Sequence, residues 1–211
     1  MTTSTEQQTD PKQRILNAAI ALFARKGFSA TGVREIAEAA DVNIAMISYY
    51  FGSKGGILEA AIDTFFQRYQ RAIQDVFQED ISLEQTIRSL IRMIVCFFRK
   101  NADLARIVFT ELPFDMPAIA EFKAKRIKAI AGLFEQQFLA MQHKDIDIGI
   151  VGPAIAGIVA FHFLQRPILK DVFGFSLDDK FYERYAEEIA DLVLYGLHGK
   201  LEPENTDNAA L

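Results

Sequence analysis

The side chains best suited to bind another molecule lie close together between Thr31 and Lys54. Within this stretch a predicted short helix carries Ala45, Ser48 and Tyr49 on one side, which gives that side a small residue, a hydroxyl and a phenol but no charge. The solvated side of a helix normally carries charged residues. We therefore predict that this side binds another molecule through hydrogen bonds and packing contacts rather than facing water.

The sequence contains no recognisable catalytic or metal-binding motif. It has no Gly-rich phosphate loop, no Gly-x-Ser-x-Gly elbow and no His-Glu-x-x-His motif. The three histidines, His143, His162 and His198, are far apart, and none follows a Glu by three residues as in di-iron bundles. We expect no enzymatic activity, no metal and no cofactor.

Two short helices joined by a turn are predicted to position the uncharged side. Apolar residues at helical spacing predict a helix over residues 32–40. Asp41 follows as the turn, because Asp is one of the few residues other than Gly that tolerate a left-handed backbone. Asn43 is placed to cap the next helix through its side-chain oxygen. Three apolar residues of that helix are predicted to face inward: Ile44, Ile47 and Phe51.

An earlier helix completes a three-helix unit. Asp10 supplies a capping oxygen, Pro11 occupies the first helical position, and Gln13 is placed to reach back to the cap. Gly27 is predicted to end this helix.

The stretch from Ile15 to Leu58 resembles the TetR family of transcriptional repressors. It departs from the family's common residues at Asp41, where Gly is usual, and at Ile44 and Ser48, where a basic residue and a Tyr are frequent. The resemblance rests on three successive motifs: Gly27-Phe28, Ile36-Ala37, and Tyr49-Tyr50-Phe51 followed by Ser53-Lys54.

This resemblance implies a helix-turn-helix that binds double-stranded DNA at an inverted-repeat operator. Tyr49 and Ser48 would contact bases or phosphates, and Ala45 would pack near a thymine methyl group. The complete set of predicted DNA contacts is Thr31, Arg34, Asn43, Ile44, Ala45, Ser48, Tyr49, Tyr50 and Lys54.

Charge is distributed unevenly along the chain. The formal net charge of -5 would repel DNA phosphates if it were spread evenly. Residues 1–57, however, hold six Lys or Arg against five Asp or Glu, so this part is weakly basic and the remainder carries the acidic excess.

A few local features of the sequence predict the cellular compartment and whether the chain enters a membrane. The single cysteine, Cys96, excludes an intramolecular disulfide and is compatible with the cytoplasm. The opening residues lack the apolar core of a signal peptide. The longest apolar run, 148–161, is shorter than the roughly 18 residues of a membrane span, so we interpret it as part of a buried helix and expect no membrane partner.

The rest of the chain is predicted to be helical, which makes the fold all-α. The DNA-binding domain is predicted over residues 10–53 and a larger regulatory domain over 54–202, with disordered tails at 1–9 and 203–211. The helix predicted over 116–142 carries four basic residues: Lys123, Lys125, Arg126 and Lys128. We interpret them as a solvated face rather than as a second DNA surface. Predicted helices of the regulatory domain cover 54–78, 82–100, 102–112, 116–142, 153–165 and 178–197.

The resemblance implies a homodimer in which the last two helices pair with their copies as a four-helix bundle. Small residues on the helix over 153–165 allow close approach, and one side of the helix over 178–197 is apolar. The predicted interface consists of Ala156, Ala160, Phe163, Tyr185, Ile189, Leu192 and Val193.

A surplus of Phe and Met predicts a pocket for an apolar or amphipathic small-molecule effector. His162 is interpreted first as a core histidine bonded to a neighbour and second as a polar anchor in that pocket. Cys96 is interpreted as a small buried residue rather than a redox sensor. The predicted pocket residues are Arg92, Met93, Cys96, Phe97, Arg106, Phe109, Phe134, Phe138 and His162.

The preferred hypothesis is thus a homodimeric, ligand-responsive repressor. One alternative is a helical protein without a DNA role, either a binder of small molecules or lipids or an enzyme, whose working part would be the larger domain. Another is a protein-binding helical module, whose small domain would contact a groove on another protein.

Overall fold

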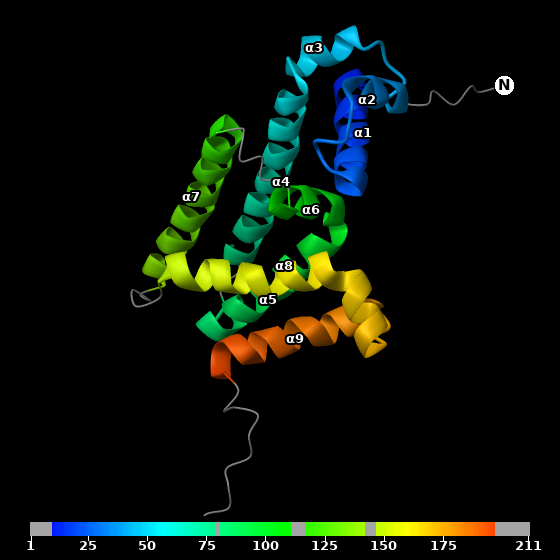
Figure 1. The fold of residues 1–211 in the computed structure, drawn as a ribbon. Coiled ribbons are helices and arrows are strands. Elements are labelled where there is room, and N and C mark those ends of the chain that lie inside the picture. The colour runs from blue at the N-terminus through cyan, green and yellow to red at the C-terminus, as the bar shows by residue number, and fades with distance from the viewer. Residues whose placement is uncertain (1–9, 79–80, 111–116, 142–146, 197–211) are drawn as a thin grey trace, which may run out of the picture. The chain divides into compact units, whose positions relative to one another are not determined.

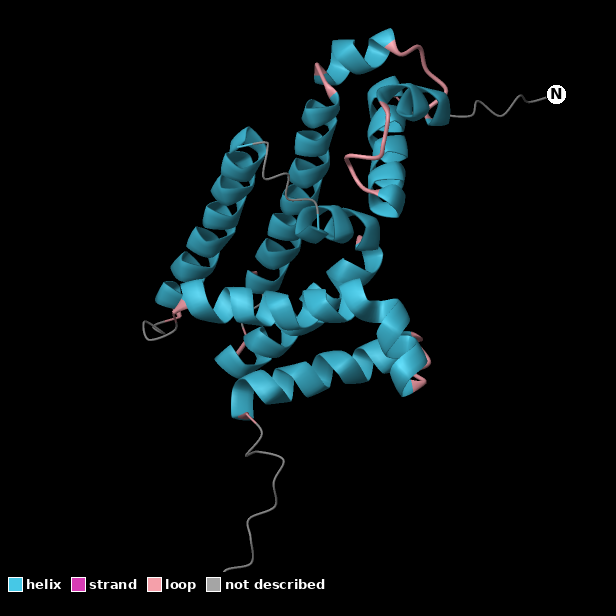
Figure 2. Cartoon of the chain, viewed as in Figure 1, coloured by secondary structure: helices cyan, strands magenta, loops and turns pink. Residues whose placement is uncertain are grey.

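The fold is all-α throughout the part of the chain that the computed structural model describes, residues 10–78, 81–110, 117–141 and 147–196 (Figures 1 and 2). Its helices are α1 (Pro11–Lys26), α2 (Val33–Ala39), α3 (Ala45–Phe51), α4 (Lys54–Phe77), α5 (Leu83–Lys100), α6 (Ala102–Thr110), α7 (Pro117–Ala140), α8 (Ile148–Phe173) and α9 (Asp179–Tyr195). The predicted tails lie outside the described residues.

Local capping residues set several helix boundaries. The Asp10 carboxylate accepts a hydrogen bond from the Lys12 amide at the start of α1, and Gly27 ends that helix. Ser53 Oγ accepts from the Gly56 amide at the start of α4. The expectation for Gln13 is wrong, because its amide donates to Asn17 Oδ1 at 2.8 Å instead of reaching back to the cap.

The chain packs as two compact units. The first contains residues up to 70 together with 101–133, and the second contains 71–100 together with the residues from 134 onward. Helices α4 and α7 each contribute residues to both units. The division at residues 53 and 54, which separates the chain by function, stays a prediction.

In the first unit, α1 packs against α2, α3 and α6 (Figure 1). Its inward residues, among them Ile15 and Phe23, are almost completely buried. The interpretation of the basic residues on α7 as one solvated face is wrong for two of them. Lys123 is half-buried and donates to the Val108 carbonyl, and Arg126 pairs with Asp63 of α4.

In the second unit, α5 packs along α9 and also contacts α8. Ile91 of α5 and Ile189 of α9 form a small apolar core with Ala190. Arg88 adds a polar layer, because its guanidinium lies 2.9 Å from Asp191 and 3.3 Å from Glu187 of α9. These contacts fix α9 on α5.

Helix α8 differs from its prediction in length and burial. It begins at Ile148, five residues before the predicted start at Pro153, and continues to Phe173 with Pro153 and Pro167 inside it. The helix is long and apolar enough to cross a membrane by length and composition, and only 22% of its most apolar 18-residue window is buried. The prediction of a buried helix is therefore wrong for the single chain, in which one side of α8 packs and the other remains uncovered.

Candidate nucleic-acid interface

The turn between α2 and α3 has the backbone geometry that the sequence predicts. Asp41 is the one residue other than Gly with a left-handed backbone among the described residues, at φ 51°. The Asp41 amide donates to the Glu38 carbonyl at 3.1 Å, and the Val42 amide donates to the Ala37 carbonyl at 3.0 Å. These bonds close the end of α2 and redirect the chain into α3.

The orientation of α3 follows from one buried residue and one cap. Ile47 is 2% exposed and fixes the inward side of the helix. Asn43 Oδ1 accepts from the Ala45 amide at 2.9 Å, which confirms the predicted cap. The prediction that Ile44 faces inward is wrong, since this side chain is 43% exposed. It lies on the same outer side as Ala45.

The outer side of α3 is as uncharged as the sequence predicts. Ala45, Ser48 and Tyr49 are all exposed, and the Tyr49 side chain is 81% exposed. Its ring packs edge-on against Tyr50 with the ring centroids 4.9 Å apart. A phenol held out from a short helix in this way can reach the edge of a base pair or a phosphate oxygen.

Two predicted contacts are used inside the protein instead. Thr31 is 1% exposed and its hydroxyl donates to the Gly27 carbonyl at 2.8 Å, so the prediction of a DNA contact through this side chain is wrong. The Lys54 ammonium donates to the carbonyls of Phe28 and Thr31, each at 3.0 Å, and lies 4.3 Å from the centroid of the Phe28 ring. Only its third N–H is left for a phosphate.

Two cations of the first unit remain available. Arg34 on α2 is exposed and forms no ion pair with any residue that the structure describes. Lys12 at the start of α1 lies 6.0 Å from the centroid of the Phe51 ring, which places its ammonium next to the end of α3. Lys12 is absent from the predicted contacts, although its position in the first turn of the first predicted helix was a usable signal.

Acidic groups near this surface are partly neutralised. Lys26 pairs with Glu35 of α2, and the hydrogen bond between them lowers the pKa of the Glu35 carboxyl. Arg14 lies 3.5 Å from the Asp41 carboxylate. These pairs reduce the repulsion that the two carboxylates would exert on a phosphate backbone.

The predicted pocket residues divide between the two units. Arg106 and Phe109 belong to the first unit and the others to the second. Phe134 and Phe138 stack on each other and contact Phe77, with centroid distances of 5.9 to 6.4 Å. Met93 is half-buried and Phe97 is buried on α5.

Arg92 and Cys96 line a surface groove of about 380 Å³ between α5 and α9. The expectation that Cys96 is buried is wrong, because it is exposed on α5. Its neighbours across the groove include Asp179 and Glu187, which pair with Arg99 and Arg92. The groove is therefore lined by ion pairs that join the two helices.

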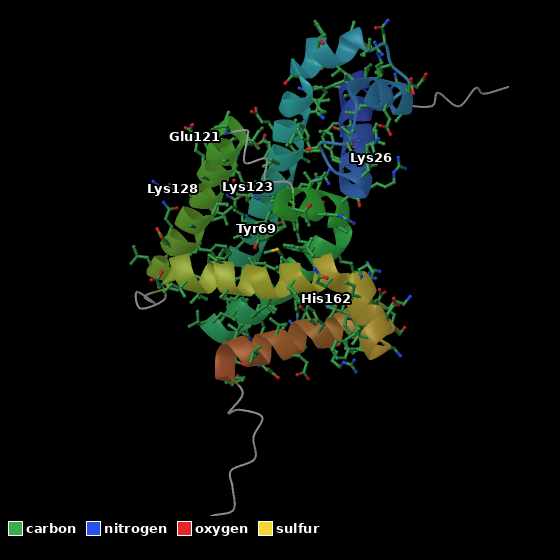
Figure 3. All side chains as sticks on the ribbon, viewed as in Figure 1. Lys26, Tyr69, Glu121, Lys123, Lys128 and His162 are labelled. Carbon is green, nitrogen blue, oxygen red and sulfur yellow. The ribbon has the colours of Figure 1, made fainter. Side chains whose placement is uncertain are left out.

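His162 on α8 is 5% exposed and lies among aromatic rings, with Tyr185 at 4.5 Å and Phe181 at 5.5 Å between centroids (Figure 3). Its Nε2 is buried without a hydrogen-bond partner in the described part of the chain. Burial, with a smaller effect of Arg166, lowers the pKa of His162. This burial fits the first interpretation, a core histidine. That interpretation also expected a hydrogen bond to a neighbouring side chain, and Nε2 has none in the described part of the chain.

The predicted dimer residues divide into two sets. Ala160 and Ile189 are buried in the core of their own unit, so the prediction that they face a partner is wrong. Ala156, Phe163, Tyr185 and Val193 are half-buried, and Leu192 is exposed. The uncovered side of α8, which the sequence analysis missed, carries larger residues at helical spacing: Ile150, Ile158, Phe161, Ile168 and Val172.

Comparison with known proteins agrees with this geometry. Residues 15–61 match the family model described as bacterial regulatory proteins, tetR family. The probable HTH-type transcriptional regulator YttP of Bacillus subtilis is 29% identical over 186 residues, which cover 84% of this chain and 89% of YttP. The HTH-type transcriptional repressor NicS of Pseudomonas putida is 25% identical over 202 residues, covering 90% of this chain and 94% of NicS.

The fold is shared with the crystal structure of the transcriptional regulator FadR from Bacillus subtilis in complex with stearoyl-CoA. That comparison has a TM-score of 0.71 at 17% identity and covers 88% of this chain and 99% of FadR. Residues 15–61 thus belong to the tetR family of bacterial regulatory proteins, and the relatives aligned with the chain over most of their length are transcriptional regulators.

Proposed function

We propose that the protein is a ligand-responsive repressor that binds an inverted-repeat operator as a homodimer in the cytoplasm. The observation that carries this proposal is the outer side of α3, which exposes Ser48 and Tyr49, with Lys12 next to the end of the helix and Arg34 exposed on α2. Hydroxyl groups on the helix can contact base edges while the flanking cations contact phosphates. The relative NicS is named as a transcriptional repressor, which supports repression rather than activation. The alternative without a DNA role is not favoured by these relatives.

The uncovered side of α8 supports the homodimer. Ile150, Ile158 and Phe161 lie on one stripe, and Ile158 and Phe161 are 37% and 61% exposed. Burying a large apolar side chain contributes roughly 1.5–3 kcal/mol, so a contact that covers several of them is strongly favoured. A two-fold dimer would cover each α8 with its own copy.

An apolar or amphipathic effector is the third part of the proposal. Phe77, Phe134 and Phe138 form an aromatic wall where α4 and α7 enter the second unit. Because α4 begins at the DNA-binding unit, a ligand that displaces its far end would move Lys54 and with it the helix-turn-helix. A ligand that favours the displaced arrangement must in turn bind less tightly when operator DNA is present.

Selection from a random-sequence duplex library at low salt tests the DNA part. The expected result is enrichment of an inverted repeat whose half-site centres are about 10 to 10.5 base pairs, or a multiple of this, apart. Failure to enrich any sequence contradicts the proposal. For the effector, any compound that raises the melting temperature is titrated with and without the selected operator, and equal affinities would show that it is not an inducer.

A further inference from the structure

We infer that α3 reads A·T base pairs mainly by contact with thymine methyl groups, so that the centre of each half-site is rich in thymine rather than guanine. The inference rests on the proposed DNA-binding function and adds the class of sequence that this surface recognises. It follows from which side chains α3 exposes and from which nearby polar groups are already used within the protein.

The exposed side of α3 combines apolar groups with the hydroxyls of Ser48 and Tyr49. Ile44, at the start of the helix, is 43% exposed and does not pack inward as its apolar side chain predicts. Ala45 follows it on the outer side, and the Tyr49 ring is exposed one turn further on. In the major groove, the one apolar group that a base pair presents is the C5-methyl group of thymine. Ile44 and Ala45 are therefore matched to thymine and to no other base.

The side chains that usually read guanine are not available on α3. Guanine is most often recognised by Arg or Lys through its O6 and N7 atoms, and no residue from Ala45 to Phe51 carries a charge. Lys54, the next cation along the chain, is bound to the carbonyls of Phe28 and Thr31. Arg34 lies on α2, where the docking of a helix-turn-helix places side chains near the DNA backbone.

The usual reader of adenine is also restricted. Asn contacts adenine through two bonds, with its oxygen accepting from N6 and its amide nitrogen donating to N7. The oxygen of Asn43 already accepts from the Ala45 amide at 2.9 Å. This bond uses one of the two lone pairs of the oxygen and holds the side-chain amide against the start of α3, so the two-bond contact with adenine competes with the cap. A hydroxyl such as that of Ser48 can bond to more than one base, so we assign the selectivity for A·T mainly to the methyl contacts.

Uracil substitution in the selected operator tests the inference directly, because deoxyuridine keeps the base pairing of thymidine and lacks only the C5-methyl group. Replacing the central thymines of one half-site should weaken binding about fourfold for each contacted methyl, from the ~0.8 kcal/mol for burying one such group. Replacing a thymine by cytosine should weaken binding more, and 5-methylcytosine should recover part of the loss. Uracil outside the half-sites serves as the DNA control.

The protein control uses two exposed isoleucines. Ile44→Ala should remove most of the difference between thymine and uracil operators, whereas Ile127→Ala on α7, where the side chain is 50% exposed, should leave it unchanged. Equal affinity for thymine and uracil operators, or selected half-sites with G·C at the centre, overturns the inference while leaving the proposed function intact. Absence of any selected sequence overturns both.

Discussion

The Lys54 ammonium donates to the Thr31 carbonyl at 3.0 Å, which ties the first residue of α4 to the segment immediately before α2. A second bond at 3.0 Å to the Phe28 carbonyl and the contact with the Phe28 ring complete this anchor. Any movement of the start of α4 is therefore transmitted to the loop that carries the helix-turn-helix. Lys54 therefore connects the start of α4 to the segment between α1 and α2, in addition to its predicted role as a phosphate contact.

Replacing Lys54 by Met should destabilise the DNA-binding unit and also weaken operator binding. Hydrogen bonds to charged groups contribute about 1.5–3 kcal/mol, and the two part-buried carbonyls would lose this donor. Urea unfolding followed by circular dichroism measures the effect. The matched control is Lys125→Met, which removes an exposed pair with Glu121 and should cost less than about 1 kcal/mol. Equal unfolding midpoints for the two variants would contradict the structural role of Lys54.

Replacing Arg34 by Ala should weaken binding to all DNA sequences by a similar factor. A side chain that neutralises one phosphate contributes to affinity but not to base selection, and its loss should reduce the slope of log Kd against log salt by about 1. Fluorescence anisotropy at several salt concentrations provides both numbers. If Arg34→Ala instead changed the sequence preference, the residue would have to be reassigned to base contact.

Replacing Phe161 by Arg should split the homodimer without unfolding the chain. Phe161 is 61% exposed in the single chain, so the substitution disturbs little internal packing but would place an unpaired charge in the proposed interface. Sedimentation velocity should show a dimer for the unaltered protein and a monomer for the variant. Ile127→Arg on α7, another exposed apolar position, should stay dimeric. A monomeric unaltered protein would contradict the proposed interface.

The buried His162 should make stability depend on pH. Because burial lowers its pKa below the ordinary value of 6.5, the unfolded chain takes up a proton at a higher pH than the folded chain does. The contribution of this residue is therefore complete above pH 6.5 and is lost as the pH falls towards the lowered pKa. His162→Phe should remove this component, which is measured as a smaller loss of unfolding free energy between neutral and acid pH at fixed protein concentration. Parallel pH profiles for both proteins would show that His162 does not titrate as its burial requires.

Features set by a few neighbouring residues could be predicted from the sequence. The cap by Asp10, the left-handed Asp41 and the cap by Asn43 depend on backbone conformations that each residue type favours locally. The helical content of the larger domain followed from apolar spacing in the same way. These features were sufficient to locate the helix-turn-helix.

Features set by packing between distant segments could not be predicted in this way. The burial of Thr31 and the bonds of Lys54 depend on where α1 ends relative to α4. The exposure of Ile44 contrasts with the burial of Ile47, and apolar spacing along one short helix does not show which of the two packs inward. The start of α8 was predicted at Pro153 because Pro is common in the first turn of a helix. The helix begins five residues earlier, at Ile148, and contains Pro153 in its interior.

Tyr49 carries the central claim, because its side chain is 81% exposed even though its ring packs edge-on against Tyr50. The decisive measurement is therefore the affinity of Tyr49→Ala for the selected operator and for a random duplex of equal length. We expect binding to the operator to weaken by about 1–3 kcal/mol if the ring contacts a base, with less change on the random duplex and an unchanged helical circular dichroism spectrum. Unaltered affinity for the operator would contradict the assignment of α3 as the surface that recognises DNA.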